Sequence, residues 1–101
     1  MFDKLLEAKQ KAEEVKKRLD SVTVSGIAEG GKIRVTASGN KEIQSISIDD
    51  ELLKTAEKDE LEELLIVAVN KALEQAENVS QSEMAALSRD MFGGLGGLFG
   101  K

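Results

Sequence analysis

Residues 64–70, with the sequence LLIVAVN, constrain the fold more than any other part of the chain. Leu and Ala, which favour helices, recur on both sides of this segment, so we expect it to lie within a helix. Its six successive apolar residues leave that helix without a polar face for water. A chain of 101 residues forms one modest core. We therefore expect one side of the helix to be covered by the same chain and the other side by a second copy.

Two apolar stripes run along this predicted helix, and they point in different directions. The first stripe, which we expect to cover a sheet, consists of Leu61, Leu65, Ala68, Ala72, Ala76 and Val79. The second stripe, which consists of Ile66, Val69 and Leu73, would then face solvent. An exposed apolar patch on a small protein usually marks an interface. An alternative is that the N-terminal helix folds back over the second stripe within a monomer. The predicted homodimer interface consists of Leu64, Ile66, Val67, Val69 and Leu73.

The first half of the chain changes from a helical to a strand-like pattern. Between residues 2 and 19, apolar residues recur at intervals of three and four, which predicts a helix with one narrow apolar seam. The seam consists of Leu5, Ala8, Ala12, Val15 and Leu19. From Ser21 the interval becomes two, which predicts strands at about residues 22–28, 33–37 and 43–48. The connections AEGGK and SGNK are short and contain glycine, as antiparallel hairpins with residues at positive φ require. We expect a three-stranded antiparallel meander.

The second half of the chain is predicted to be helical. A short helix is expected in DELLKTAEK, and the pair Asp59 and Glu62 is typical of the N-cap of a longer helix that ends near Met91. Some 30 helical residues span roughly 45 Å, so the far end should project from the domain. The fold class is therefore α+β. We expect one domain over residues 1–92 and a flexible glycine-rich tail over residues 93–101.

Composition excludes several classes of protein. The chain has no Cys and no His, so it offers neither a thiolate nor an imidazole to a metal or to acid–base catalysis. No segment approaches the roughly 20 apolar residues of a membrane span, and the charged first 20 residues are not expected to act as a secretory signal. We therefore expect a cytoplasmic protein that is not an enzyme, needs no cofactor or metal, and uses neither a membrane nor a small-molecule substrate as partner.

Two motifs suggest chemistry that their context does not support. GIAEGGK, residues 26–32, matches the start of a phosphate-binding loop, but Ile33 stands where a Mg²⁺-binding Ser or Thr is required. The next residues alternate as a strand instead of opening a helix. Asp49, Asp50 and Glu51 could hold a hard cation, yet they lack the spacing of a calcium loop, and helix capping explains them better. The carboxylates of residues 57–63 likewise suit a helix N-terminus.

Charge is distributed unevenly along the sequence. Residues 1–41 carry nine Lys or Arg against six Asp or Glu, whereas residues 42–101 carry five against thirteen, so the two parts have charges of +3 and −8. Lysines beside a narrow seam are often only a solvated face, and that interpretation stays open. The functional hypothesis is that a dimer presents them to the phosphates of duplex DNA. The candidate DNA-binding residues of the first helix are Lys4, Lys9, Lys11, Lys16, Lys17 and Arg18, with Lys32 and Arg34 of the hairpin as further candidates.

In several stretches the sequence resembles the small bacterial nucleoid-associated proteins of the YbaB/EbfC type. The likeness lies in LLEAKQKAEEVKKRLDSVTVSG, VTASGN, ISIDDELL and DELEELLIVAVNKALEQAE. This resemblance implies a tweezer-like homodimer with protruding helices that binds DNA, alters its conformation, and acts in nucleoid organisation and gene expression. It also implies a place in the nucleoid and DNA contacts by Lys71 and Arg89 of the long helix. That helix, however, also carries Glu74, Glu77, Glu83 and Asp90.

A second hypothesis comes from the acidic part of the chain. The long helix and the tail could engage a cytosolic protein, in which case the chain would be an interaction adaptor without DNA binding. The charge of −8 over residues 42–101 motivates this alternative.

Overall fold

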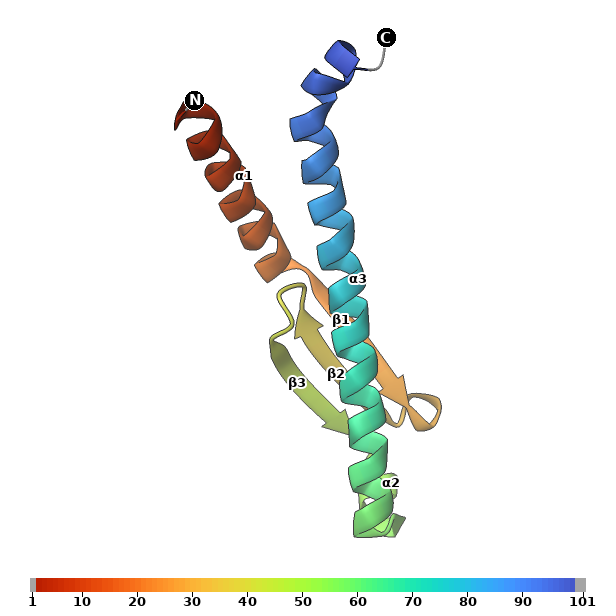
Figure 1. Ribbon diagram of the computed structural model, residues 1–101. Helices are drawn as coiled ribbons and strands as arrows, with labels where there is room; N and C mark the ends of the chain where they lie inside the picture. The colour runs from red at the N-terminus through yellow and green to blue at the C-terminus, as the bar shows by residue number, and fades with distance from the viewer. Residues whose placement is uncertain (1, 100–101) are drawn as a thin grey trace.

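The computed structural model describes the backbone of residues 2–99 and the side chains of residues 3–90. The chain forms a helix, a three-stranded sheet, a short helix and a long helix (Figure 1). This order confirms the α+β fold predicted from the sequence. The elements are α1 (Phe2–Ser21), β1 (Thr23–Ala28), β2 (Ile33–Ser38), β3 (Ile43–Ile48), α2 (Asp50–Thr55) and α3 (Lys58–Phe99), with a 3-10 turn, η1 (Glu29–Gly31), between β1 and β2.

The sheet is an antiparallel meander in the order β1-β2-β3. Apolar residues that are paired across the strands share one face, as Val35 and Ile46 do. The register of the β2–β3 pairing changes beside Thr36, because Ala37 pairs with Ile43 whereas Thr36 pairs with Ser45. Gln44 is therefore an extra residue in β3, and this bulge keeps Ile43 on the same face as Ile46 although the two are three residues apart.

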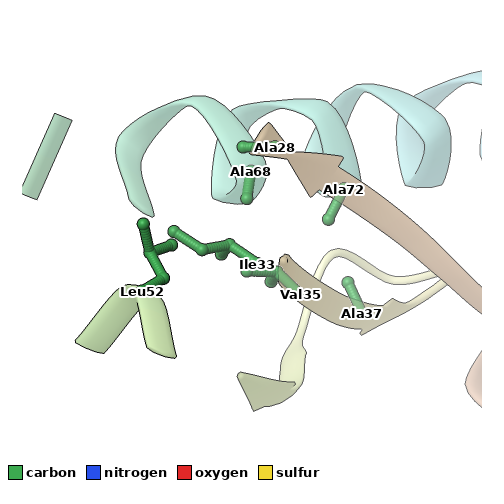
Figure 2. Close-up of a cluster of buried hydrophobic side chains, with 7 residues drawn as sticks. All are labelled: Ala28, Ile33, Val35, Ala37, Leu52, Ala68 and Ala72. Atoms are coloured by element: carbon green, nitrogen blue, oxygen red, sulfur yellow. The ribbon is translucent and has the colours of Figure 1, made fainter. Parts of the chain in front are cut away.

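Helix α3 crosses this apolar face above β1 and β2 (Figure 1). Ala68, Ala72 and Ala76 are fully buried, which confirms that the first predicted stripe covers the sheet. On β1, a Cβ at Gly26 would lie 2.3 Å from the carbonyl oxygen of Ala68, so glycine lets the helix come this close. Figure 2 shows the core beneath α3, which consists of Ala28, Ile33, Val35, Ala37, Leu52, Ala68 and Ala72.

Helix α1 is attached to the rest of the chain at its C-terminal end. Val15 and Leu19 are buried. The β2–β3 turn then closes the end of the helix: Gly39 N donates a hydrogen bond to the carbonyl oxygen of Leu19 at 2.9 Å, and Asn40 Nδ2 donates to that of Lys16 at 2.9 Å. These bonds satisfy carbonyl groups that the last turn of a helix leaves without partners. The fold thus fixes the base of α1 more firmly than its beginning.

The two hairpin turns use glycine for different reasons. Gly30 and Gly31 have positive φ, as predicted for the first turn. In the second turn the prediction was wrong, because the positive φ belongs to Lys41 and not to Gly39. Gly39 is needed for space, since a Cβ there would lie 2.8 Å from Leu19 Cδ2.

Beyond the sheet, α1 and α3 diverge from the same end of the molecule as two arms (Figure 1). The molecule measures 63 × 26 × 17 Å, in agreement with the expected projection of the long helix. Helix α1 lies beside the outer half of α3, where Val15 shares a cavity with Ala86 and Leu87. It therefore does not cover the second apolar stripe, in which Ile66 is 59% exposed. The alternative of a helix folded back over that stripe is wrong for this chain.

The helix boundaries differ from the predictions in places. Helix α3 begins at Lys58, so Asp59 lies in its first turn instead of at its N-cap. Its carboxylate still suits the positive end of the helix dipole. Asp49 caps α2 as expected, because its side chain accepts a hydrogen bond from Leu52 N at 3.2 Å. Helix α3 continues to Phe99 instead of ending near Met91, since adding a residue to an existing helix is far easier than starting one.

The predicted flexible tail, residues 93–101, overlaps the last part of α3. Its final two residues and all of its side chains lie outside the described residues. The flexibility of this segment, and with it the proposed domain boundary at residue 92, stays a prediction.

Candidate nucleic-acid interface

The N-terminal part of α1 is an exposed arm. Among residues 3–14 only Ala8 and Lys11 are half-buried, and the first buried side chain is that of Val15. The predicted seam therefore makes close contact only toward its C-terminal end. Leu5 at its other end is 68% exposed. The basic residues of α1 consequently stand on a helix that is accessible to a large partner.

Seven-residue spacing divides these basic residues between two sides of α1. Lys11 and Arg18 line a cavity of about 130 Å³ between α1 and α3, so this flank faces the second arm. Lys4 precedes Lys11 by seven residues and falls on the same flank. Lys9 and Lys16 lie about 160° away around the helix at 100° per residue, and therefore point away from α3.

Two of the three cations on the inner flank, Lys11 and Arg18, are paired with carboxylates. Lys11 Nζ lies 3.5 Å from Glu7 Oε1 on the same helix. Arg18 Nε donates a hydrogen bond of 2.9 Å to Glu83 Oε1 of α3. In contrast, Lys9, Lys16 and Lys17 are exposed and form no ion pair with any side chain that the structure describes.

The two basic residues of α3 do not join this group. Lys71 lines a groove beside β1, together with Ser25 and Gly26. Arg89 is exposed and lies about 100° around the helix from Asp90, which faces α1 across the cavity. The structure thus places Lys11 and Arg18 of α1 beside α3, whereas Arg89 lies on a side of α3 that does not face α1.

A second feature of the molecule is an uncovered apolar surface. One helix of about 10–12 Å diameter covers roughly two strands spaced about 4.8 Å apart, so α3 leaves β3 open. Ile46 is 52% exposed, although it belongs to the same sheet face as the buried Val35. The flank of α3 nearest β3 is identified by Glu77, which pairs with Lys41 in the β2–β3 turn.

Two residues of the predicted interface adjoin this opening. Ile66 and Leu73 lie within about 40° of Glu77 around the axis of α3, at 100° per residue. Val69 falls between this flank and the core, against which it is partly packed. We call the surface formed by Ile43, Ile46, Ile66 and Leu73 the open apolar surface.

The other two predicted interface residues lie elsewhere. Leu64 and Val67 are within about 40° of Lys71, on the flank of α3 beside β1. Leu64 is partly packed against the core, and Val67 is 41% exposed. The sequence-based prediction thus assigned to one interface residues that the fold places on opposite flanks of α3.

The structure gives no support to a phosphate-binding loop in residues 26–32. Gly26 lies inside strand β1 under α3, and Lys32 follows the 3-10 turn that leads into β2. Within the described residues there is no cluster of three potential metal-ligating side chains. No helix in the described part of the chain is long and apolar enough to cross a membrane.

Three features of this site were missed by sequence reasoning. The pairing of Arg18 with Glu83 joins residues 65 positions apart, and no local pattern indicates it. The role of Asn40 in closing α1 is equally non-local. A signal did exist for the open apolar surface, because the three-residue interval between Ile43 and Ile46 interrupts the alternation and marks the bulge.

Comparison with known proteins agrees with this fold. The chain is 42% identical over 89 residues to a nucleoid-associated protein of Flavobacterium johnsoniae, covering 88% of this chain and 82% of the relative. It is 36% identical over 94 residues to a nucleoid-associated protein of Chlorobium phaeobacteroides, covering 93% and 83% of the two chains. A crystal structure of an uncharacterized Helicobacter pylori protein has the same fold, with a TM-score of 0.66, 22% identity, and coverage of 80% of this chain and 93% of that one.

Residues 1–91 match the family described as the YbaB/EbfC DNA-binding family. This match covers both arms up to residue 91, the sheet and α2. The chain belongs to the YbaB/EbfC DNA-binding family.

Proposed function

We propose that this chain is a non-enzymatic nucleoid-associated protein that binds duplex DNA as a homodimer and alters the conformation of the DNA. The observation that carries the proposal is the set of exposed lysines Lys9, Lys16 and Lys17 of α1, which form no ion pair with any described side chain. The protein has a net charge of −5, so these lysines form a local basic surface on an acidic molecule. Such a surface attracts phosphates mainly through release of the counterions that surround DNA.

Duplex DNA fits this surface better than a single strand does. The sequence contains three Phe and neither Trp nor Tyr, so it offers few side chains on which unpaired bases could stack. Lysine contacts to phosphates position a protein on DNA without reading its sequence. We therefore infer that the protein binds DNA with little sequence preference and is located in the nucleoid. We also infer that the changed DNA conformation affects nucleoid organisation and gene expression.

The homodimer is supported by the open apolar surface. Ile46 and Ile66 are each more than half exposed, and they lie on adjoining elements of one side of the molecule. A two-fold axis would bring the same patch of each chain together and bury it. Dimerisation would also double the number of basic arms, and two arms could contact one duplex with greater avidity than one.

Binding to a labelled duplex at several salt concentrations tests this function. Changing Lys9, Lys16 and Lys17 to Gln should weaken binding and reduce the slope of log affinity against log salt by about 0.9 for each phosphate that the variant no longer neutralises. The matched control changes Lys54, Lys58 and Lys71 to Gln, which removes the same charge from α2, the start of α3 and the groove beside β1. Equally weakened binding by both triple variants would contradict the assignment of the site to α1.

The adaptor hypothesis has a separate test. If the wild-type protein bound no duplex even at low salt, and a nuclease-treated cell extract yielded one defined protein partner, the acidic α3 arm would become the candidate site. The family match favours DNA over this alternative.

A further inference from the structure

We propose that Glu83 of α3 competes with DNA phosphate for Arg18 of α1, so that duplex binding must displace a carboxylate of the protein itself. This inference rests on the proposed DNA-binding function, and it adds a residue that limits the affinity. No property of the long helix alone identifies Glu83 among its many carboxylates.

The geometry of the pair carries the proposal. Arg18 Nε and Glu83 Oε1 are 2.9 Å apart, which is the distance of a charge-assisted hydrogen bond. The Arg18 side chain is 58% exposed, so a phosphate can reach the guanidinium from solvent. A phosphate and a carboxylate at the same guanidinium use the same kind of N–H donor and repel each other. The two ligands therefore exclude or weaken each other.

The surroundings of Arg18 strengthen this competition. The cavity between the arms is lined by the cations Lys11 and Arg18, and also by the carboxylates Glu14 and Asp90. A phosphate that approached Arg18 from between the arms would meet negative charge from both helices. Lys9 and Lys16 lie on the other side of α1, away from the carboxylates that line this cavity. The inner and outer flanks of α1 thus differ in how readily they accept phosphate.

The Arg18–Glu83 pair also connects the two arms beyond the sheet. Among the described side chains, it is the one hydrogen bond between α1 and α3. Displacement of Glu83 by a phosphate would remove this polar link and leave the packing of Val15 near Ala86 and Leu87. DNA binding at Arg18 is therefore coupled to loosening of the arms.

The experiment is a duplex-binding titration of the full chain at low salt. Glu83→Gln should bind about three- to fivefold more tightly than the wild type, the effect expected when an exposed ion pair no longer competes. Glu74→Gln removes the same charge and is the matched control. Glu74 lies nine residues, or roughly 13 Å, along α3 and lines the groove beside β1, so screening should keep its effect below about twofold.

Two further variants separate competition from general charge effects. Glu83→Asp keeps the charge but shortens the reach of the carboxylate, and it should also bind DNA more tightly than the wild type. In an Arg18→Gln background, Glu83→Gln should give no greater increase in affinity than Glu74→Gln, because the contested guanidinium is gone. Circular dichroism and sedimentation should show that all variants remain folded and in the same oligomeric state as the wild type.

Other outcomes would overturn the proposal. Equal effects of Glu83→Gln and Glu74→Gln would show that Glu83 acts only through net charge. Weaker binding by Glu83→Gln would show that the pair holds α1 in the binding position instead of competing with DNA. In both cases the wild type would still bind duplex, so the proposed function would stand. Absence of duplex binding by the wild type would instead contradict the function itself.

Discussion

Gly26 of β1 lies directly against Ala68 of α3, and a Cβ at Gly26 would be 2.3 Å from the carbonyl oxygen of Ala68. The same Cβ would be 2.3 Å from Ala72 N. Both of these neighbouring atoms belong to the backbone, so rotation of a side chain cannot relieve the clash. Helix α3 therefore packs on the sheet at a position of β1 that has no room for a side chain.

Gly26→Ala should consequently destabilise the protein. The added methyl group must push α3 away from β1, and over-packing of this kind costs about 1–3 kcal/mol. Urea unfolding followed by circular dichroism measures the change. Ser25→Ala, at the neighbouring position on the other face of β1, is the control and should change the free energy of unfolding by less than about 0.5 kcal/mol. Equal stability of Gly26→Ala and wild type would show that α3 is not held this closely.

Asn40→Ala should loosen the base of α1. Its side chain donates hydrogen bonds to the carbonyl oxygen of Lys16 and to Asp20 Oδ1, and loss of such bonds costs about 1 kcal/mol. We expect faster amide hydrogen exchange in residues 15–21 and a lower free energy of unfolding. Asn78→Ala, at an exposed position of α3, is the control and should leave exchange in α1 unchanged. Unaltered exchange in Asn40→Ala would contradict this role.

The ion pair between Lys41 and Glu77 predicts a dependence of stability on pH. Hydrogen bonds from Lys41 and, to a smaller extent, from Gln81 lower the pKa of Glu77 below its ordinary value of 4.5. A carboxyl group whose pKa is lower in the folded protein than in the unfolded chain stabilises the folded state. This stabilisation is fully present above the pKa of the unfolded state, and it is lost as the pH falls through the pKa of the folded state. Wild type should therefore be more stable than Glu77→Gln at pH 7, and the difference should disappear in acid.

Urea unfolding of wild type and Glu77→Gln at about pH 7, 5, 4 and 3 measures this dependence. Because the pair is exposed, added salt should reduce the difference at pH 7. Glu74→Gln serves as the charge-matched control. A difference between wild type and Glu77→Gln that stayed constant below pH 4 would mean that the ion pair is not its source.

Ile46→Glu should weaken dimerisation without unfolding the chain. The side chain is 52% exposed in the single chain, so the substitution costs little there, but it would bury a charge in the proposed dimer. Sedimentation at micromolar concentration should show a predominantly monomeric variant, and Ile66→Glu should behave similarly. Leu53→Glu, on α2 and outside the open apolar surface, is the control. Persistence of the wild-type association state in both isoleucine variants would place the interface elsewhere.

Sequence periodicity determined the secondary structure and its order because these depend on local spacing. Intervals of three and four residues identified α1, alternation identified the strands, and the first stripe of α3 was correctly placed against the sheet. The resemblance in the stretches from VTASGN to the apolar run at residues 64–70 agreed with the family found by comparison. The candidate lysines of α1 also followed from spacing along the predicted helix.

Tertiary structure decided which of these residues meet. Spacing alone could not show that Arg18 pairs with Glu83, since the two residues are 65 positions apart and meet only because α1 lies beside α3 in the fold. Nor could it show that Leu64 and Val67 lie apart from Ile66, because apolar residues around the whole helix give no direction. The open apolar surface exists because one helix covers only about two strands of a three-stranded sheet.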